Sequence, residues 1–273
     1  MIPAAFEYER ADSIDHAIEL LDGADDAKIL AGGHSLLPLM KTRLAQPSLL
    51  VDISRIGDLS YIREDDEGIA IGALTRHHDV ADSELLQQAV PIVADTATQI
   101  GDPQVRHMGT IGGSIAHADP AGDMGTVMLA LGASFVMRGP GGASRTVVAE
   151  DFFQGLFQAD LAPNEVLAEI RVPKTSGGWS YLKFNRRAID WAMVGVAAVQ
   201  HNGSASVALT NMGDTPIRAS GVEEALAGGA DPSTASARAD EGTSPPSDAF
   251  GSAEYRKEVS KVLVRRALED ALA

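Results

Sequence analysis

Apolar and polar positions alternate in short blocks along the first part of the chain. Between Ser13 and Gly23 apolar side chains recur every three or four residues, which predicts a helix that Ser13 caps and Gly23 ends. Short apolar runs at 28–31 and 48–53 predict buried strands, and a second helical pattern at 36–44 lies between them. This strand–helix–strand order predicts a βαβ unit with a right-handed crossover.

From about residue 56 the pattern changes to short strands around one helical block. The predicted strands lie at 59–63, 68–73, 133–138, 145–149 and 166–172. A helical pattern at 83–100 separates the second strand from the third. These elements predict a second subdomain of the α+β class.

The last third of the chain has a different pattern. Apolar stretches at 179–184, 193–200 and 205–209 predict an antiparallel meander. Residues 228–251 are rich in Gly, Pro, Ser, Asp and Ala, which predicts a mobile loop. Apolar residues then gather on one face between Tyr255 and Leu272, and they predict a closing amphipathic helix.

These patterns predict a domain at 1–174, with subdomains at about 1–55 and 56–174, followed by a domain at 175–273. A length of 273 residues and a hydrophobic fraction of 45% suit folded domains of this size. No apolar run is long enough to cross a membrane, and the start of the sequence lacks a signal-peptide pattern. We therefore expect a cytoplasmic protein that meets the inner face of the membrane only through partners.

Charge narrows the partners that the chain can bind. A net charge of -16 argues against nucleic acid and anionic lipid, both of which require basic surface. Proteins and small molecules are the expected partners. The acidic composition fits a salt-rich cytoplasm and an ordinary acidic bacterial protein equally well, and the composition does not decide between them.

Two Gly-Gly motifs carry the clearest chemistry, Ala31–Ser35 (AGGHS) and Thr110–Ser114 (TIGGS). Glycines can adopt positive φ and leave backbone N–H groups free to surround phosphate oxygens, and Ser35 can cap the helix that follows. Together the motifs suit a diphosphate, although either alone is more typical of a structural turn. Neither has the spacing of a Rossmann motif or a P-loop.

Other polar residues lie close to the second motif. Asp119 and Pro120 together are typical of a helix start, and Asp123 in the first turn beyond them suits hydrogen bonds from ribose or ribityl hydroxyls. The histidines near the motifs lack the spacing of a metal site, so we predict packing or ligand contact for them and no metal ligand. These are His34, His77, His78, His107 and His117.

The two motifs, the segment Asp102–Arg106 between them and the Asp119-Pro120 pair resemble the FAD-binding subunits of molybdenum hydroxylases. The resemblance covers essentially the whole chain. It is strongest to the medium-subunit branch of aerobic carbon monoxide dehydrogenases, on stretches such as Gly33–Leu44 and Ala253–Arg256.

The resemblance implies a fold of the vanillyl-alcohol-oxidase (PCMH) type, in the α+β class. Such a fold has two N-terminal α/β subdomains, a C-terminal domain of antiparallel sheet and helices, and FAD between them. The residues implied to contact FAD are Lys28, Ile29, Leu30, Ala31, Gly32, Gly33, His34, Ser35, Leu36, Thr110, Ile111, Gly112, Gly113, Ser114, Asp119, Asp123, Lys183 and Trp191. It implies no catalytic residue for substrate in this chain.

Three of these positions shape the expected cofactor chemistry. Lys183 alternates with apolar neighbours in its strand, so its ammonium suits the pyrimidine edge of a flavin, although an exposed strand lysine is the simpler interpretation. Ser114 stands where the family usually has Asn. Trp191 stands where it often has Tyr, which keeps a stacking surface and loses a hydroxyl.

The family resemblance also implies how the chain works. A molybdenum-cofactor large subunit would oxidise the substrate, and a 2Fe-2S small subunit would pass electrons to FAD here, within a dimer of heterotrimers. A quinone or another acceptor would then take the electrons. The absence of cysteine agrees with clusters held elsewhere. Other substrates, such as xanthine, aldehydes or N-heterocycles, and a non-redox nucleotide-binding scaffold are the alternative interpretations.

Overall fold

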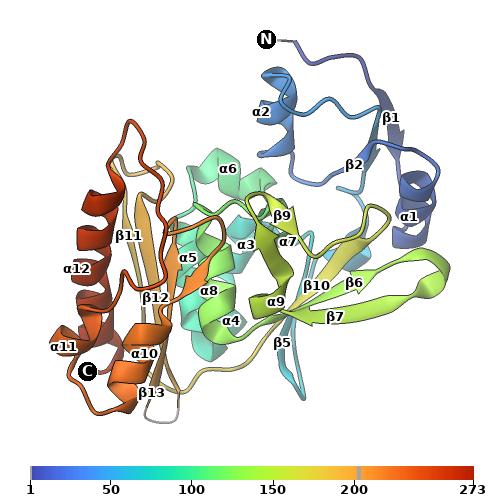
Figure 1. Ribbon diagram of the computed structural model, residues 1–273. Coiled ribbons are helices and arrows are strands. Elements are labelled where there is room, and N and C mark those ends of the chain that lie inside the picture. Colours follow the sequence, from blue (N-terminus) through green and yellow to red (C-terminus); the bar gives the residue numbers. More distant parts are fainter. Residues whose placement is uncertain (1, 202–203) are drawn as a thin grey trace.

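The computed structural model describes residues 2–201 and 204–273, which form three packed parts in chain order (Figure 1). The first part is a parallel three-stranded sheet of order β1-β3-β2 with two helices. Its elements are β1 (Glu7–Arg10), α1 (Ile14–Asp22), β2 (Ala27–Leu30), α2 (Leu36–Lys41) and β3 (Leu49–Asp52). The predicted cap is confirmed, because the Ser13 side chain accepts from the His16 N–H and Gly23 follows the helix.

The second part is a five-stranded antiparallel sheet of order β4-β5-β10-β6-β7, covered on one face by helices. Its strands are β4 (Ile62–Asp65), β5 (Gly68–Gly72), β6 (Ser134–Arg138), β7 (Ser144–Val148) and β10 (Val166–Val172). Its helices are α3 (His77–Asp82), α4 (Glu84–Ala89), α5 (Pro91–Thr98), α6 (Pro103–Met108), α7 (Ile111–His117), α8 (Asp123–Leu131) and α9 (Ala149–Phe152). The hairpin β8 (Phe153–Gly155) and β9 (Gln158–Ala159), and 3-10 turns at Gly57–Leu59 and Pro140–Gly142, complete it.

The helical region is longer and more broken than the pattern predicts. Residues 83–100 contain two helices in place of one, because Ser83 caps α4 and Pro91 begins α5. Further helices continue to Leu131.

The third part contains the predicted meander, a four-stranded sheet of order β11-β12-β13-β14. Its elements are β11 (Trp179–Phe184), β12 (Val194–His201), β13 (Ser204–Thr210), β14 (Ile217–Arg218), α10 (Ser220–Ala227), α11 (Pro232–Ser236) and α12 (Ala253–Ala271). The prediction of a loop throughout 228–251 is wrong at α11. Ala235 in this helix and Ala239 just after it are buried in the core of this part, so the small residues pack instead of leaving the segment unstructured.

The β12 strand shows how the second and third parts share a core. Val194, Val196 and Ala198 pack beneath α12 and α10, whereas Ala197 and Val199 face the core of the second part. A strand buried on both faces is hydrophobic at nearly every position, and Val194–Val199 carries no polar side chain. Figure 1 shows the result as layers, with α12 outermost and the α5 and α8 helices on the other side of the sheet.

The expected α+β architecture is confirmed, with two N-terminal subdomains and a C-terminal part of antiparallel sheet and helices. Within residues 2–201 and 204–273, no helix combines the length and the apolar character that a membrane span needs.

Candidate functional site

The fold brings the two Gly-Gly motifs together. The first follows β2, and a Cβ atom added to Gly32 would lie 2.1 Å from the carbonyl oxygen of Met108, two residues before Thr110. The Arg76 guanidinium donates to that same carbonyl, at 2.7 Å, and the Arg76 backbone forms a β-bridge with Thr110. Only a glycine allows this close approach at position 32.

The first motif is a loop, as the sequence predicts. Gly33 has φ +73°, and a Cβ atom there would lie 2.9 Å from the Leu37 side chain. Ser35 does not fulfil its predicted role as a cap, because within the described residues its side chain makes no capping hydrogen bond and its φ and ψ are already helical. The Leu37 N–H bonds instead to the Gly33 carbonyl. Lys28, Ile29 and Leu30 lie on β2, and Leu36 begins α2.

The second motif is the first turn of helix α7, where the sequence predicts a loop. Its amides already have partners: the Ile111 and Gly112 N–H groups donate to Thr75 and Ala73 carbonyls, and the Gly113 N–H donates to the Thr110 hydroxyl. The prediction of free N–H groups is therefore wrong for these positions. Glycine is needed because the helix lies against Ala73, whose Cβ would be 2.4 Å from a Cβ atom on Gly112.

The Asp119-Pro120 pair does not begin a helix, which corrects the prediction. The Asp119 side chain accepts from the Ala121 N–H at 2.9 Å, and the Gly122 N–H closes the turn on the Asp119 carbonyl. Helix α8 begins at Asp123. The Asp119 side chain thus bonds to the backbone of its own turn, and such local hydrogen bonds commonly compete with helix capping.

Asp123 forms a buried polar cluster with two side chains from the third part of the fold. Lys183 Nζ lies 2.9 Å from Asp123 Oδ2, and the Tyr181 hydroxyl donates to Oδ1 at 2.6 Å. The Asp123 and Lys183 side chains are each 4% exposed. Lys183 also donates to the Gln99 carbonyl at 3.2 Å. Because residues 181 and 183 alternate along β11, both point from one face of that strand toward α8.

Burial sets the electrostatics of this cluster. It raises the pKa of Asp123, while the charge of Lys183 and the Tyr181 hydroxyl act in the opposite direction. Burial and the neighbouring carboxylate also raise the pKa of Tyr181 well above its ordinary value. The tyrosine therefore stays a hydrogen-bond donor at neutral pH.

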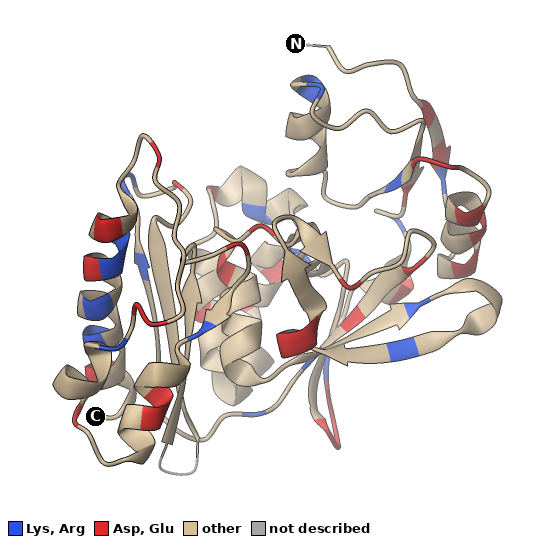
Figure 2. Ribbon diagram, in the orientation of Figure 1, with Lys and Arg blue, Asp and Glu red and all other residues tan. Residues whose placement is uncertain are grey.

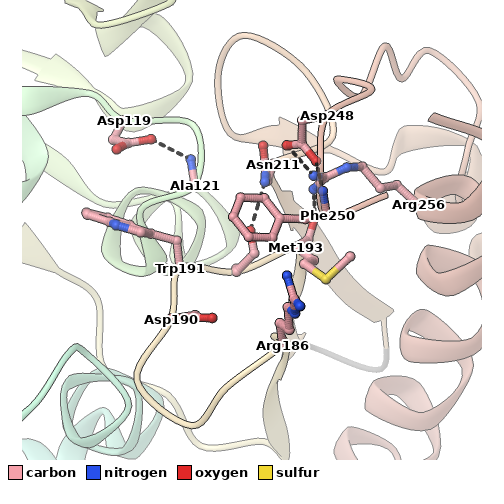
Figure 3. A pocket seen from close by; sticks show the side chains of 11 residues that line it. Asp119, Ala121, Arg186, Asp190, Trp191, Met193, Asn211, Asp248, Phe250 and Arg256 are labelled. Carbon is pink, nitrogen blue, oxygen red and sulfur yellow. Dashed lines mark hydrogen bonds and ion pairs between the residues drawn. The ribbon is translucent and has the colours of Figure 1, made fainter. Parts of the chain in front are cut away.

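Trp191 lies apart from this cluster, at the edge of a cavity of about 340 Å³ (Figure 3). The indole is 60% exposed. The cavity is lined by Asp119, Ala121, Arg186, Asp190, Trp191, Ala192, Met193, Asn211, Asp248, Phe250 and Arg256.

Several residues at these sites were not predicted from the sequence. A signal for Tyr181 was present, because it shares a strand face with Lys183 two positions later. Asn211 and Arg256 come from distant segments, and although the stretch Ala253–Arg256 contributes to the family resemblance, no pattern around either residue indicates a site. Arg256 is 1% exposed and donates to Asp248 at 2.7 Å. No group of three His, Asp or Glu side chains suited to a metal occurs in the part of the chain that the structure describes.

Comparison with known proteins identifies the family. The model for the FAD binding domain in molybdopterin dehydrogenase matches residues 4–175, and that for the CO dehydrogenase flavoprotein C-terminal domain matches 179–271. The chain belongs to the FAD-binding medium subunits of molybdenum hydroxylases. FAD is the cofactor of this family.

Relatives match along their full lengths. The carbon monoxide dehydrogenase medium chain of Afipia carboxidovorans is 44% identical over 100% of this chain and 99% of the relative. The glyceraldehyde dehydrogenase medium chain of Sulfolobus acidocaldarius is 39% identical, with 99% of each covered. A structure of carbon monoxide dehydrogenase from Hydrogenophaga pseudoflava superposes with a TM-score of 0.94 at 43% identity, covering 100% of this chain and 99% of that one.

Proposed function

We propose that this chain is the FAD-binding electron-transfer subunit of a molybdenum hydroxylase complex of the carbon monoxide dehydrogenase type. It would take electrons from a 2Fe-2S small subunit, after a molybdenum-cofactor large subunit has oxidised the substrate. A quinone would receive them. The buried Asp123–Lys183 pair carries this proposal, because it joins β11 of the third part to helix α8, which packs against the α7 helix of the second Gly-Gly motif.

The residues present fit FAD. Gly32 brings the first motif against the segment that leads into the second, so a diphosphate could contact both. The carboxylate of Asp123 has one donor on each oxygen, which leaves lone pairs for ribityl hydroxyls. The Lys183 ammonium would favour negative charge on a nearby ring. When bound, FAD supplies redox chemistry that accepts electrons singly and releases them in pairs.

The remaining family residues complete the proposal. Lys28 to Leu30 position the first loop, and Trp191 covers one face of the flavin ring. The same proposal divides the chain at 174/175 and holds FAD between the two domains. A cytoplasmic location and a dimer of heterotrimers are part of the same proposal.

The flavin spectrum of the purified chain tests the cofactor. We expect FAD absorption bands after reconstitution, and loss of FAD in Gly32→Ala, whose added methyl group would meet the Met108 carbonyl. Gly57→Ala is the matched control, since among the described residues nothing lies within 4 Å of a Cβ atom there. A chain that folds and takes up no FAD would leave the non-redox scaffold as the better interpretation.

The substrate of the complex needs a separate experiment. Another hydroxylase is the second candidate, because the glyceraldehyde dehydrogenase relative is also similar over 99% of this chain. Native co-purification followed by metal analysis and carbon monoxide-dependent dye reduction separates the two candidates. Dye reduction with an aldehyde and none with carbon monoxide would favour the second.

A further inference from the structure

The cavity beside Trp191 is built from segments that neither Gly-Gly motif supplies. Trp191, Arg186 and Asp190 come from the loop between β11 and β12, whereas Asp248 and Phe250 come from the segment before α12. Figure 3 shows both loops facing one space, with the Arg186 side chain extending toward Phe250 and Met193. The two loops are far apart in sequence, so the cavity depends on the folded third part.

The walls of the cavity are suited to a flat aromatic ligand. Trp191 and Phe250 are 60% and 55% exposed at its edge, which is unusual for large aromatic side chains. Met193 adds an adaptable apolar surface. Aromatic rings gain from stacking or edge-to-face contact with a third ring, so this lining favours a planar ring over an extended chain.

Polar groups at the same cavity favour a ligand that accepts hydrogen bonds. Arg186 lines the cavity, and none of the ion pairs within residues 2–201 and 204–273 involves its guanidinium, so its donors are available. The carboxylates of Asp119, Asp190 and Asp248 line the same cavity. A neutral ring with a carbonyl oxygen meets these conditions better than a charged ligand, because the nearby carboxylates disfavour anions.

The Phe250 side of the cavity is held in place before any ligand binds. Arg256, which is 1% exposed, donates to the Met193 carbonyl and to the Asp248 carboxylate. That carboxylate also accepts from the N–H groups of Phe250 and Gly251. A buried charge with these partners fixes the backbone around the phenyl ring, which lowers the ordering cost of binding.

The cavity adjoins the proposed flavin position without coinciding with it. It shares Trp191 and Asp119 with the expected flavin contacts. Among the described residues that line it, however, there is neither Asp123 nor Lys183, and none from the two Gly-Gly motifs. Trp191 and Asp119 are therefore where the cavity meets the proposed flavin position.

We propose that this cavity binds the electron acceptor as a planar quinone ring, between Trp191 and Phe250, with Arg186 donating to a quinone oxygen. The assignment rests on the proposed function, and it adds the site that the acceptor occupies. In this assignment the quinone and FAD bind in adjacent sites, so the quinone does not compete with FAD.

Binding of menadione to the FAD-loaded full chain tests the assignment, by equilibrium dialysis and without turnover. We expect saturable binding that weakens about tenfold in Phe250→Ala and in Arg186→Ala, with the FAD content unchanged. Because the chain has no cysteine, thiol addition cannot imitate binding. Phe157→Ala is a control of similar exposure, 52%, and Arg187→Ala is the neighbouring arginine outside the lining.

Three results would overturn the proposal. Equal affinity in all four variants would show that menadione binds elsewhere. Binding to the FAD-free chain and not to the FAD-loaded chain would show that the flavin ring itself fills the cavity. Absence of saturable binding to the FAD-loaded chain would show that the cavity does not take a quinone. Failure to load FAD is seen first in the absorption spectrum, and it counts against the proposed function.

Discussion

At the residue scale, the chain holds two tyrosine–carboxylate pairs of the same chemistry in different places. The Tyr181 hydroxyl donates to Asp123 between the second and third parts of the fold. The Tyr61 hydroxyl donates to Glu169 on the five-stranded sheet, where Arg63 and Arg171 also bind that carboxylate. Removing one hydroxyl at a time from the two pairs can therefore separate an effect on FAD binding from an effect on stability.

Tyr181→Phe removes the hydroxyl on Asp123 while retaining the ring. We expect the free energy of unfolding to fall by about 1 kcal/mol and FAD to bind about tenfold more weakly, with a larger loss toward acidic pH. The acid effect follows because the pKa of Asp123, already raised by burial, rises further without this donor. Titration of the FAD-free chain with FAD at several pH values measures it.

Tyr61→Phe is the control for that substitution. It should cost similar stability and leave FAD affinity and its pH dependence unchanged, because Tyr61 interacts with Glu169 and not with Asp123. If both variants lost the same FAD affinity, Tyr181 would act through stability alone.

His77 gives a second prediction at this scale. Burial lowers its pKa to about 4, so the folded chain holds it neutral while the unfolded chain protonates it near its ordinary value. The contribution of neutral His77 to the free energy of unfolding, about 3 kcal/mol, is therefore complete above about pH 6.5 and is lost as the pH falls through about 4. In His77→Phe, the free energy of unfolding measured with urea should depend less on pH between about 4 and 6.5. The same pH dependence in the variant and the original chain would contradict this role of His77.

At the scale of elements, the sequence predicts an element best where its own hydrophobic pattern determines it. The helix after Ser13 and the meander strands were predicted close to their observed bounds. The β1 strand was not predicted, because all four of its residues are exposed and it is a strand only through its pairing with β3. Helix α7 was hidden because Gly-Gly is typical of a loop, whereas contacts with Ala73 and Thr75 favour the helix.

Gly112→Ala tests the explanation for α7. Intrinsic helix propensity favours alanine by about 1 kcal/mol, whereas an added Cβ atom would lie 2.6 Å from the Ala73 carbonyl oxygen. The steric clash is expected to dominate, so the variant should lose about 2 kcal/mol of unfolding free energy. Thermal unfolding beside Gly57→Ala measures this. A gain in stability would show that the helix can move away from Ala73.

At the scale of the whole molecule, the two larger parts are joined by a shared core and by buried polar contacts, namely the Asp123 cluster and the hydrogen bond between Thr210 and Thr126. Tyr181, Ala197 and Val199 from the third part lie in the core of the second. Sequence patterns could divide the chain but could not show which faces meet, because alternation identifies a buried face without naming its partner. For the same reason Asp123 and Lys183 were each recognised, while their pairing with Tyr181 was not.

Charge gives the last prediction, since it belongs to no single element. Acidic residues lie over all three parts in Figure 2, whereas β12 and β13 carry no charge. A net charge of -16 places repulsion on the folded chain, and salt screens it over about 10 Å at 0.1 M. We expect the unfolding temperature to rise with potassium chloride and to level off once screening is complete. A continued rise at molar salt would favour adaptation to a salt-rich cytoplasm, and a fall from the start would show that ion pairs such as Arg145 with Asp160 outweigh the repulsion.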